Sequence, residues 1–291
     1  MELADDVGRG AWLAGRAGGW GRVGGVAGTG FEAYARLLHP VDAWRDDPVL
    51  LTAWGTPVVA EEARWPWAEV AARREKVMHP LVQWRRLTDD ETALDLPGGW
   101  HVEQSREGWF APDLLAALTV HLGAATTTPE GLTAGVWNGF GKLTGSSFVF
   151  VFADGTDPQE AERTRAELAA QRERSVSPAV RAACTRGPFL HWPGRDFLLL
   201  DTSLDELSDP GWVHRAGLGW DADTKGVMPQ LLWPADHAWV VASEIDWDST
   251  IVAGPRTLID AVLGDPLFEA YGVSEDADLT WDGDTVNPRI P

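Results

Sequence analysis

Three carboxylates near the C-terminal end of the chain are the first candidates for chemistry. Glu244, Asp246 and Asp248 occupy alternate positions of the segment 239–248, which its apolar alternation predicts to be a strand. Because side chains alternate between the two faces of a strand, the three carboxylates would stand on one face, ~7 Å apart. Like charges at that spacing repel one another unless a cation, an arginine or water lies between them.

A divalent cation is one way to hold such a row, because hard cations prefer oxygen ligands. Glu244, Asp246 and Asp248 would then be the metal ligands, and a metal-bound water would act as the nucleophile of a hydrolase. Glu244, Asp246 and His237, which lies just before the strand, are the candidate catalytic residues, with His237 moving the proton. Two structural alternatives remain open: an arginine-paired network, or a solvated strand face in an acidic protein.

Other motifs lack a residue or an element that their chemistry requires. The run Gly19–Gly24 matches G-x-G-x-x-G, but more glycines follow where the dinucleotide motif needs a helix. Asp221 opens a stretch like a calcium loop, but Leu232 stands where a bidentate glutamate is needed. Cys184 is the only cysteine, which excludes an intramolecular disulfide and cysteine-based zinc sites. No cofactor is therefore expected, apart from the divalent cation of the hydrolase alternative.

Histidines outside this strand are predicted to serve structure. His39 and His79 each precede a proline, and we expect them to bond backbone groups at turns. An open alternative places both in one pocket as converging polar groups. His121 lies on the apolar face of a predicted helix and is expected to be a hydrogen-bonded core residue.

The elements that would position these residues are mixed in type. Apolar alternation and short apolar runs predict strands, and prolines followed by helical spacing predict helix starts. The strands are expected at 31–39, 136–137, 148–152, 197–200, 239–247 and 251–252, and the helices at 66–76, 111–122, 157–174 and after Pro255. Without a regular strand–helix alternation, this order predicts an α+β fold, mainly an antiparallel sheet with flanking helices.

The chain shows no convincing linker, so we expect a single globular domain over residues 1–291. Three segments depart from its general pattern. These are a glycine-rich, loop-rich N-terminal segment (1–30), a charged helical insertion at about 154–186, and an acidic, loosely ordered tail (274–291).

Composition restricts the partners. The chain carries 44 acidic against 24 basic residues, a net charge of −20. Such a field repels nucleic acid and anionic membranes and favours a basic protein partner. Seventeen tryptophans predict a core rich in indole rings, with an exposed platform for sugars or peptides as the alternative. The N-terminus lacks the basic and apolar stretch of a signal peptide, so a soluble, cytoplasmic protein is expected.

Several residue blocks resemble a family of uncharacterised actinobacterial proteins. These blocks span most of the chain: 30–40, 79–84, 126–129, 136–141 and, most specifically, 232–246 with Asp248-Ser249-Thr250 and Gly254. The resemblance implies a bacterial, cytoplasmic, single-domain protein, and the charged helix near 157–174 resembles an addition to the family pattern. It implies no catalytic residues, because the family has no established activity.

The sequence therefore predicts a non-catalytic, acidic protein that binds a partner or ligand. Its charge and the failure of every strong catalytic motif support this prediction. The alternative is a metal-dependent hydrolase that uses the carboxylate row. A third hypothesis is glycan binding through exposed tryptophans.

Overall fold

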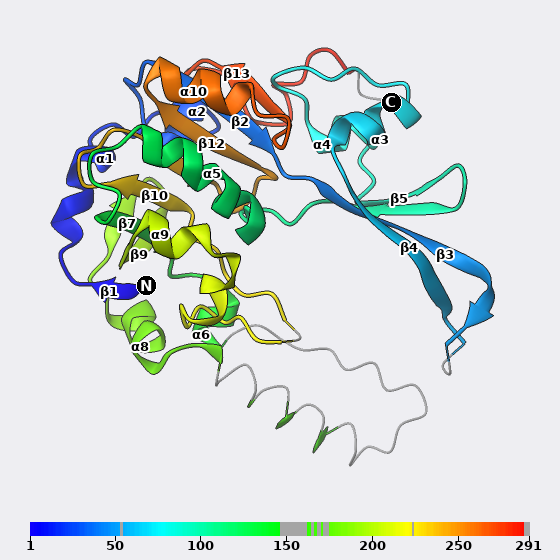
Figure 1. Ribbon diagram of the computed structural model, residues 1–291, viewed down its shortest axis with the longest axis horizontal. Helices are drawn as coiled ribbons and strands as arrows, with labels where there is room; N and C mark the ends of the chain where they lie inside the picture. Colours follow the sequence, from blue (N-terminus) through cyan, green and yellow to red (C-terminus); the bar gives the residue numbers. More distant parts are fainter. Residues whose placement is uncertain are drawn as a thin grey trace. The chain divides into compact units, whose positions relative to one another are not determined.

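The computed structural model describes residues 1–52, 55–145, 175–222 and 224–287, with isolated helical positions between 162 and 170 (Figure 1). It confirms the α+β class, since helices accompany strands whose pairing is antiparallel. The chain divides into two compact units, each made of two chain segments. Unit 1 combines Met1–Gly15 with Ala111–Trp239, and unit 2 combines Arg16–Phe110 with Val240–Pro291. Within the described ranges, no helix is long and apolar enough to span a membrane.

Unit 1 is built on an antiparallel set of strands in the order β1-β9-β7-β10. Strand β8 pairs with the N-terminal half of β9, on the edge opposite β7 that β1 also occupies. The central strands are almost fully buried, as the apolar runs at 136–137 and 197–200 predict. The strands are β1 (Glu2–Ala4), β7 (Leu132–Trp137), β8 (Leu190–Trp192), β9 (Arg195–Thr202) and β10 (Leu231–Pro234).

The longest helix of unit 1, α5 (Pro112–Ala124), forms where its sequence predicts. Pro112 takes the first turn, where the missing N–H has no helical partner to lose. Leu114, Leu115, Leu118 and Leu122 are buried, and α5 contacts α9 and η2. The other helices of the unit are η1 (Val7–Gly10), α1 (Ala11–Ala14), α6 (Gly141–Thr144), α8 (Pro178–Arg186), α9 (Leu204–Ser208) and η2 (Pro210–His214).

Unit 2 contains a second antiparallel set in the order β11-β12-β2-β13. The strand predicted at 31–39 is confirmed as β2, but the expected half-buried pattern is wrong, because all six residues are buried, Arg36 included. Strand β2 lies between β12 and β13, and helix α10 contacts it. The elements are α2 (Val23–Ala27), β2 (Ala33–Leu38), β11 (Val240–Ser243), β12 (Ser249–Gly254), α10 (Arg256–Leu263) and β13 (Ala270–Val273).

A further antiparallel set in unit 2 has the order β4-β3-β6-β5. Strand β6 pairs with β3 only over Asp42–Arg45, so the rest of β3 and β4 continues as a two-stranded ribbon (Figure 1). At the base of the ribbon, Trp67 and Trp84 pack into a buried cluster with Val102. The elements are β3 (Val41–Leu51), β4 (Pro57–Trp65), α3 (Trp67–Arg73), α4 (Trp84–Leu87), β5 (Ala93–Leu96) and β6 (Trp100–Glu103).

Indole rings fill much of the interior. The side chains of Trp67, Trp84, Trp212, Trp233 and Trp239 are under 2 % exposed, as expected for a tryptophan-rich core. Among the tryptophans that the structure describes, Trp20 and Trp281 stand out as strongly exposed, at 79 % and 54 %.

The N-terminal segment is less loop-rich than its glycines predict. Helix α2 includes Gly24 and Gly25, and the backbone of Gly19 approaches Gly25 so closely that a Cβ there would lie 2.1 Å from the Gly19 oxygen. These glycines therefore permit close backbone packing, which the sequence pattern alone could not distinguish from a loop. The predicted strand at 148–152 and most of the predicted helix at 157–174 lie outside the described residues.

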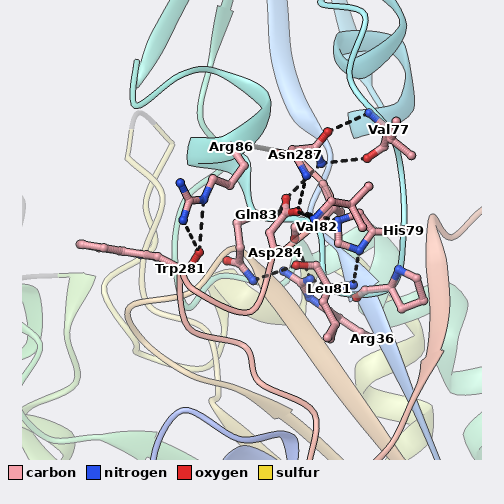
Figure 2. Close-up of polar contacts among 12 residues, drawn as sticks. Arg36, Val77, His79, Leu81, Val82, Gln83, Arg86, Trp281, Asp284 and Asn287 are labelled. Carbon is pink, nitrogen blue, oxygen red and sulfur yellow. Dashed lines mark hydrogen bonds and ion pairs between the residues drawn. The ribbon is translucent and has the colours of Figure 1, made fainter. Parts of the chain in front are cut away.

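The expectation of a loosely ordered tail is wrong for residues 274–287. Asp284 and Asn287 are buried, at 3 % and 2 % exposed, and Leu279 is in the core. The Asp284 carboxylate accepts hydrogen bonds from His79 Nε2 (2.8 Å) and the Gln83 amide (3.2 Å), and Asn287 bonds both backbone groups of Val77 (Figure 2). The tail is thus fastened to the 77–83 segment of unit 2 by side chains rather than by a strand or helix.

Candidate functional site

The predicted carboxylate row does not form. Strand β11 ends at Ser243, and residues 244–248 make a turn that leads into β12. Within this turn the Glu244 carboxylate accepts a hydrogen bond from the Asp246 amide (2.7 Å). Strand alternation therefore does not apply beyond Ser243, and the prediction that Glu244, Asp246 and Asp248 stand on one strand face is wrong.

Contacts from the 104–108 segment explain why the strand stops. The Gly108 amide donates to the Trp247 carbonyl (2.8 Å), and a Cβ on Gly108 would lie only 2.7 Å from the Ile245 Cα. Gly108 also has φ +62°, a conformation that favours glycine. The turn is therefore held by a segment distant in sequence, which no local pattern could reveal.

Asp248 is buried rather than presented to solvent. It is 7 % exposed, and burial raises the pKa of its carboxyl, while the positive charge of Arg36 acts in the opposite direction. Arg36 is itself 1 % exposed and donates to Ser249 Oγ (3.0 Å) and the Val82 carbonyl (2.7 Å). Burial lowers the pKa of Arg36 to about 10, so it stays charged at neutral pH. Asp248 thus belongs to an arginine-containing buried network.

Two residues near Asp248 were missed by the sequence reasoning. Gln104 Nε2 donates to the Asp248 carboxylate (3.4 Å) and to Glu107 (3.3 Å). Burial raises the pKa of Glu107, and the charges of Asp248 and Asp246 raise it further. Over the residues that the structure describes, however, no three or more histidine, cysteine, aspartate or glutamate side chains come together in a way that could hold a metal ion.

A chain of hydroxyl groups links His39 to strand β11. His39 Nε2 lies 2.8 Å from Thr250 Oγ1, which in turn lies 2.7 Å from Ser243 Oγ. All three side chains are buried, and burial lowers the pKa of His39 to about 3, so the imidazole is neutral. His39 bonds the Thr250 side chain, and a backbone hydrogen bond with Arg106 opposes the effect of burial on its pKa. His79 does accept from the Leu81 amide (3.3 Å), in addition to its contact with Asp284.

His237 lies in unit 1, on the turn that follows β10. Its amide donates to the Pro234 carbonyl (2.9 Å), and its φ of +57° is the left-handed conformation usually taken by glycine or asparagine. The Thr126 and Thr127 hydroxyls bond the carboxylate of the neighbouring Asp236, which fixes the turn. The exposed imidazole of His237 stacks on Trp12, with ring centroids 4.0 Å apart.

This stacked pair borders a cavity of about 420 Å³, which we call the Trp12 cavity. Residues from η1, α1 and the ends of three strands line it. Its lining is Asp6, Gly8, Arg9, Trp12, Gly131, Leu132, Thr133, Asp201, Trp233, Ala235 and His237. His237 was predicted to move a proton beside the carboxylates Glu244 and Asp246, but neither of these residues lines the cavity that it borders.

Strand register explains the polar groups of the Trp12 cavity. Thr133 of β7 is paired with Asp201 of β9 on one side and with Trp233 of β10 on the other. Directly paired residues of antiparallel strands point to the same face, so a carboxylate, a hydroxyl and an indole stand in a row. Arg9 reaches this row from η1, forming an ion pair with Asp201 and a 3.5 Å contact with Thr133 Oγ1.

The ribbon of β3 and β4 carries a second candidate surface, which we call the ribbon tip: Val49, Leu50, Leu51 and Val59. These side chains are 81 %, 57 %, 62 % and 43 % exposed. The Asp47 carboxylate accepts hydrogen bonds from the amides of Val49 and Leu50 (2.8 Å each), in a region where the β3–β4 register shifts. Contiguous exposed apolar residues of this kind often mark interaction sites.

Comparison of this chain with protein-family models, with curated proteins and with solved structures found no match. The functional argument therefore depends on the geometry of the chain itself.

Proposed function

We propose that this protein is a non-catalytic binding protein that captures a basic protein partner through the β3–β4 ribbon. The observation that carries the proposal is the ribbon tip, where three consecutive apolar side chains are exposed to water. Burying them in an apolar groove of a partner would release about 25 cal/mol per Å² of apolar surface.

The charge of the ribbon defines the partner's chemistry. Residues 45–62 include Asp46, Asp47, Glu61 and Glu62, against the single basic residue Arg45, which pairs with Glu61 (2.6 Å). A partner groove bordered by arginine or lysine would complement this apolar tip and its acidic flanks. Electrostatic steering by a chain of net charge −20 would increase the association rate with such a partner.

The ribbon is suited to binding rather than to packing within its own unit. Beyond Arg45, β3 has β4 as its strand partner, and isolated two-stranded hairpins are marginally stable in water. Exposing the apolar tip costs stability, and a partner that covers the tip would recover it. We also propose that the chain belongs to the uncharacterised actinobacterial family that it resembles. We propose a cytoplasmic location for it as well.

Affinity capture from a cell lysate tests the proposal when it is combined with variants of the ribbon. The bait is the full chain, used at ~50 mM and ~500 mM salt, which changes the screening length about threefold. We expect a basic protein that the wild type retains at low salt. The double variant Val49→Ser/Leu50→Ser should lose it, and Glu61→Gln/Glu62→Gln should weaken its retention.

Val120→Ser provides the matched control, because Val120 is 74 % exposed but lies on α5 of unit 1. Retention of the same partner by this control would show that the ribbon residues are specifically needed. Absence of any salt-sensitive partner, or equal capture by wild type and ribbon variants, contradicts the proposal.

A further inference from the structure

The Trp12 cavity offers a binding site in unit 1 that is independent of the ribbon. We propose that it binds a small neutral saccharide, a mono- or disaccharide, through the Trp12 indole and the Arg9–Asp201 ion pair. Its volume of about 420 Å³ lies near the lower end of the range of ligand pockets, ~300–1,000 Å³, so the ligand must be small.

Charge within the cavity excludes an anionic ligand, because the carboxylates of Asp6 and Asp201 outnumber the guanidinium of Arg9. Arg9 balances one of the two carboxylates through its ion pair with Asp201, so hydroxyl groups are the natural complement of that pair. A sugar hydroxyl both donates and accepts, so it can donate to a carboxylate and accept from a guanidinium at the same time. The ion pair of Arg9 with Asp201 presents these two complementary groups side by side.

Both members of this ion pair keep surface toward the cavity. The side chain of Asp201 is 55 % exposed and that of Arg9 is 32 % exposed. Arg9 uses Nη1 for its contacts with both Asp201 and Thr133, and a guanidinium carries five N–H donors. The outer part of the fork and the exposed part of the carboxylate can therefore bond adjacent hydroxyl groups of one sugar ring.

The apolar surface of the site comes from Trp12. The half-buried Trp12 of α1 lines the cavity, whereas Trp233 of β10, at 1 % exposed, closes the wall and offers almost no surface to a ligand. Indole rings offer a broad apolar surface against which the C–H face of a pyranose can pack. Because His237 stacks on Trp12 at 4.0 Å, no ring can enter between these two residues, so a ligand must lie beside the pair.

His237 supplies a structural reason to regard the cavity wall as a binding feature. Its left-handed φ of +57° is strained for a residue with a Cβ, and glycine would take it at no steric cost. Strained backbone positions persist where the surrounding structure holds them, and they cluster at active sites and ligand sites. At this strained position, the His237 imidazole stacks on Trp12 and forms part of the wall of the Trp12 cavity.

Calorimetric titration of the full chain, together with saturation-transfer NMR, tests this inference. The probes are methyl glycosides of glucose, galactose, mannose and N-acetylglucosamine, with maltose and cellobiose. Adenine serves as a planar aromatic probe without a sugar ring. We expect at least one saccharide to bind with a Kd below about 1 mM, and adenine to bind more weakly than this saccharide.

Three variants locate the binding. Trp12→Ala and Asp201→Asn should each weaken the affinity about tenfold, and His237→Gly should weaken it while leaving the melting temperature unchanged or raised. Asp205→Asn, an exposed carboxylate on α9 of the same unit, should bind as the wild type does. Circular dichroism of each variant shows whether it is folded.

Failure of every saccharide at ~10 mM, tenfold above that Kd, overturns the inference, as does equal binding by wild type and Trp12→Ala. Preferential binding of adenine also overturns it. None of these results bears on the ribbon, since Val49→Ser/Leu50→Ser should bind the saccharide normally.

Discussion

Replacing Asp284 by asparagine tests whether the C-terminal tail stabilises unit 2. The side chain of Asp284 is 0 % exposed, and its two oxygens divide the donors of the surrounding segment (Figure 2). Oδ1 accepts from His79 Nε2, the Val286 amide and the Asn287 amide, at 2.8–3.1 Å. Oδ2 accepts from the Gln83 amide (3.2 Å) and Asn287 Nδ2 (3.1 Å).

The magnitude follows from these donors. In Asp284→Asn, the new NH₂ group must replace one oxygen, and the smaller disturbance places it at Oδ2. There it faces two N–H donors that lose their acceptor, each at a cost of ~1–3 kcal/mol. We therefore expect a loss of about 3 kcal/mol in the free energy of unfolding. At roughly 2–4 °C per kcal/mol, the melting temperature should fall by about 6–12 °C.

Equilibrium urea unfolding and thermal melts, both followed by tryptophan fluorescence, measure this loss. Asp282→Asn is the matched control, because the Asp282 side chain is 93 % exposed and lies 3.7 Å from Arg86. Exposed pairs of this kind contribute ~0–1 kcal/mol, so the control should remain close to wild type. If Asp284→Asn stays within about 0.5 kcal/mol of the wild type, the tail does not stabilise the unit and the reasoning is refuted.

Lowering the pH should reproduce part of the stability loss expected for Asp284→Asn. Burial alone would raise the pKa of Asp284, but the hydrogen bonds from Asn287, Gln83 and His79 outweigh burial and lower it. A lowered folded-state pKa means that the carboxylate stabilises the fold above the unfolded value of 3.8, and that this stability is lost as pH falls through the folded pKa. Asp284→Asn should lack this acid-dependent loss.

Three further predictions address the interior and the carboxylates. His39, with its pKa lowered to about 3, stays neutral in the fold, so stability should fall by up to about 1.4 kcal/mol per pH unit between pH 6.5 and 3. His39→Gln keeps a group able to reach Thr250 and should reduce that slope in pH-dependent urea unfolding; an unchanged slope contradicts the assignment. Trp67→Ala should cost about 3–5 kcal/mol in the same measurement, and Trp20→Ala less than about 0.5, since their exposures are 0 % and 79 %; equal losses would show that the indoles do not form the core. Titration with Mg²⁺, Mn²⁺ or Ca²⁺ should leave the melting temperature unchanged, whereas a cation at 100 times its Kd would add about 2.7 kcal/mol; a rise that Asp246→Asn removes would revive the hydrolase hypothesis.

Elements with strong local signals could be predicted from the sequence. Pro112 and Pro255 mark the starts of α5 and α10, and the apolar runs at 197–200 and 251–252 lie within β9 and β12. In each case the apolar positions of neighbouring residues are enough to choose between helix and strand. The α+β class follows from the sum of these local choices.

The candidate site could not be predicted, because distant segments decide it. The turn at 244–248 depends on Gly108, and the charge of Arg36 acts on the buried Asp248. The alternation of apolar and polar residues in the sequence does not reveal either interaction. Among the predicted candidates, only His237 lines the Trp12 cavity, and two other lining residues, Arg9 and Asp201, are separated by 192 positions along the chain.

The position of β2 in its sheet has a consequence for synthesis on the ribosome. The side chains of Arg36 on β2 and Ser249 on β12 bond to each other, although they are 213 positions apart. Strand β13, the other neighbour of β2, is translated later still. Because parts of a chain fold only when their partners have emerged, β2 leaves the ribosome with both edges and its apolar side chains unprotected. We therefore expect chaperone contacts to concentrate on residues 33–38 of the nascent chain until translation is nearly complete.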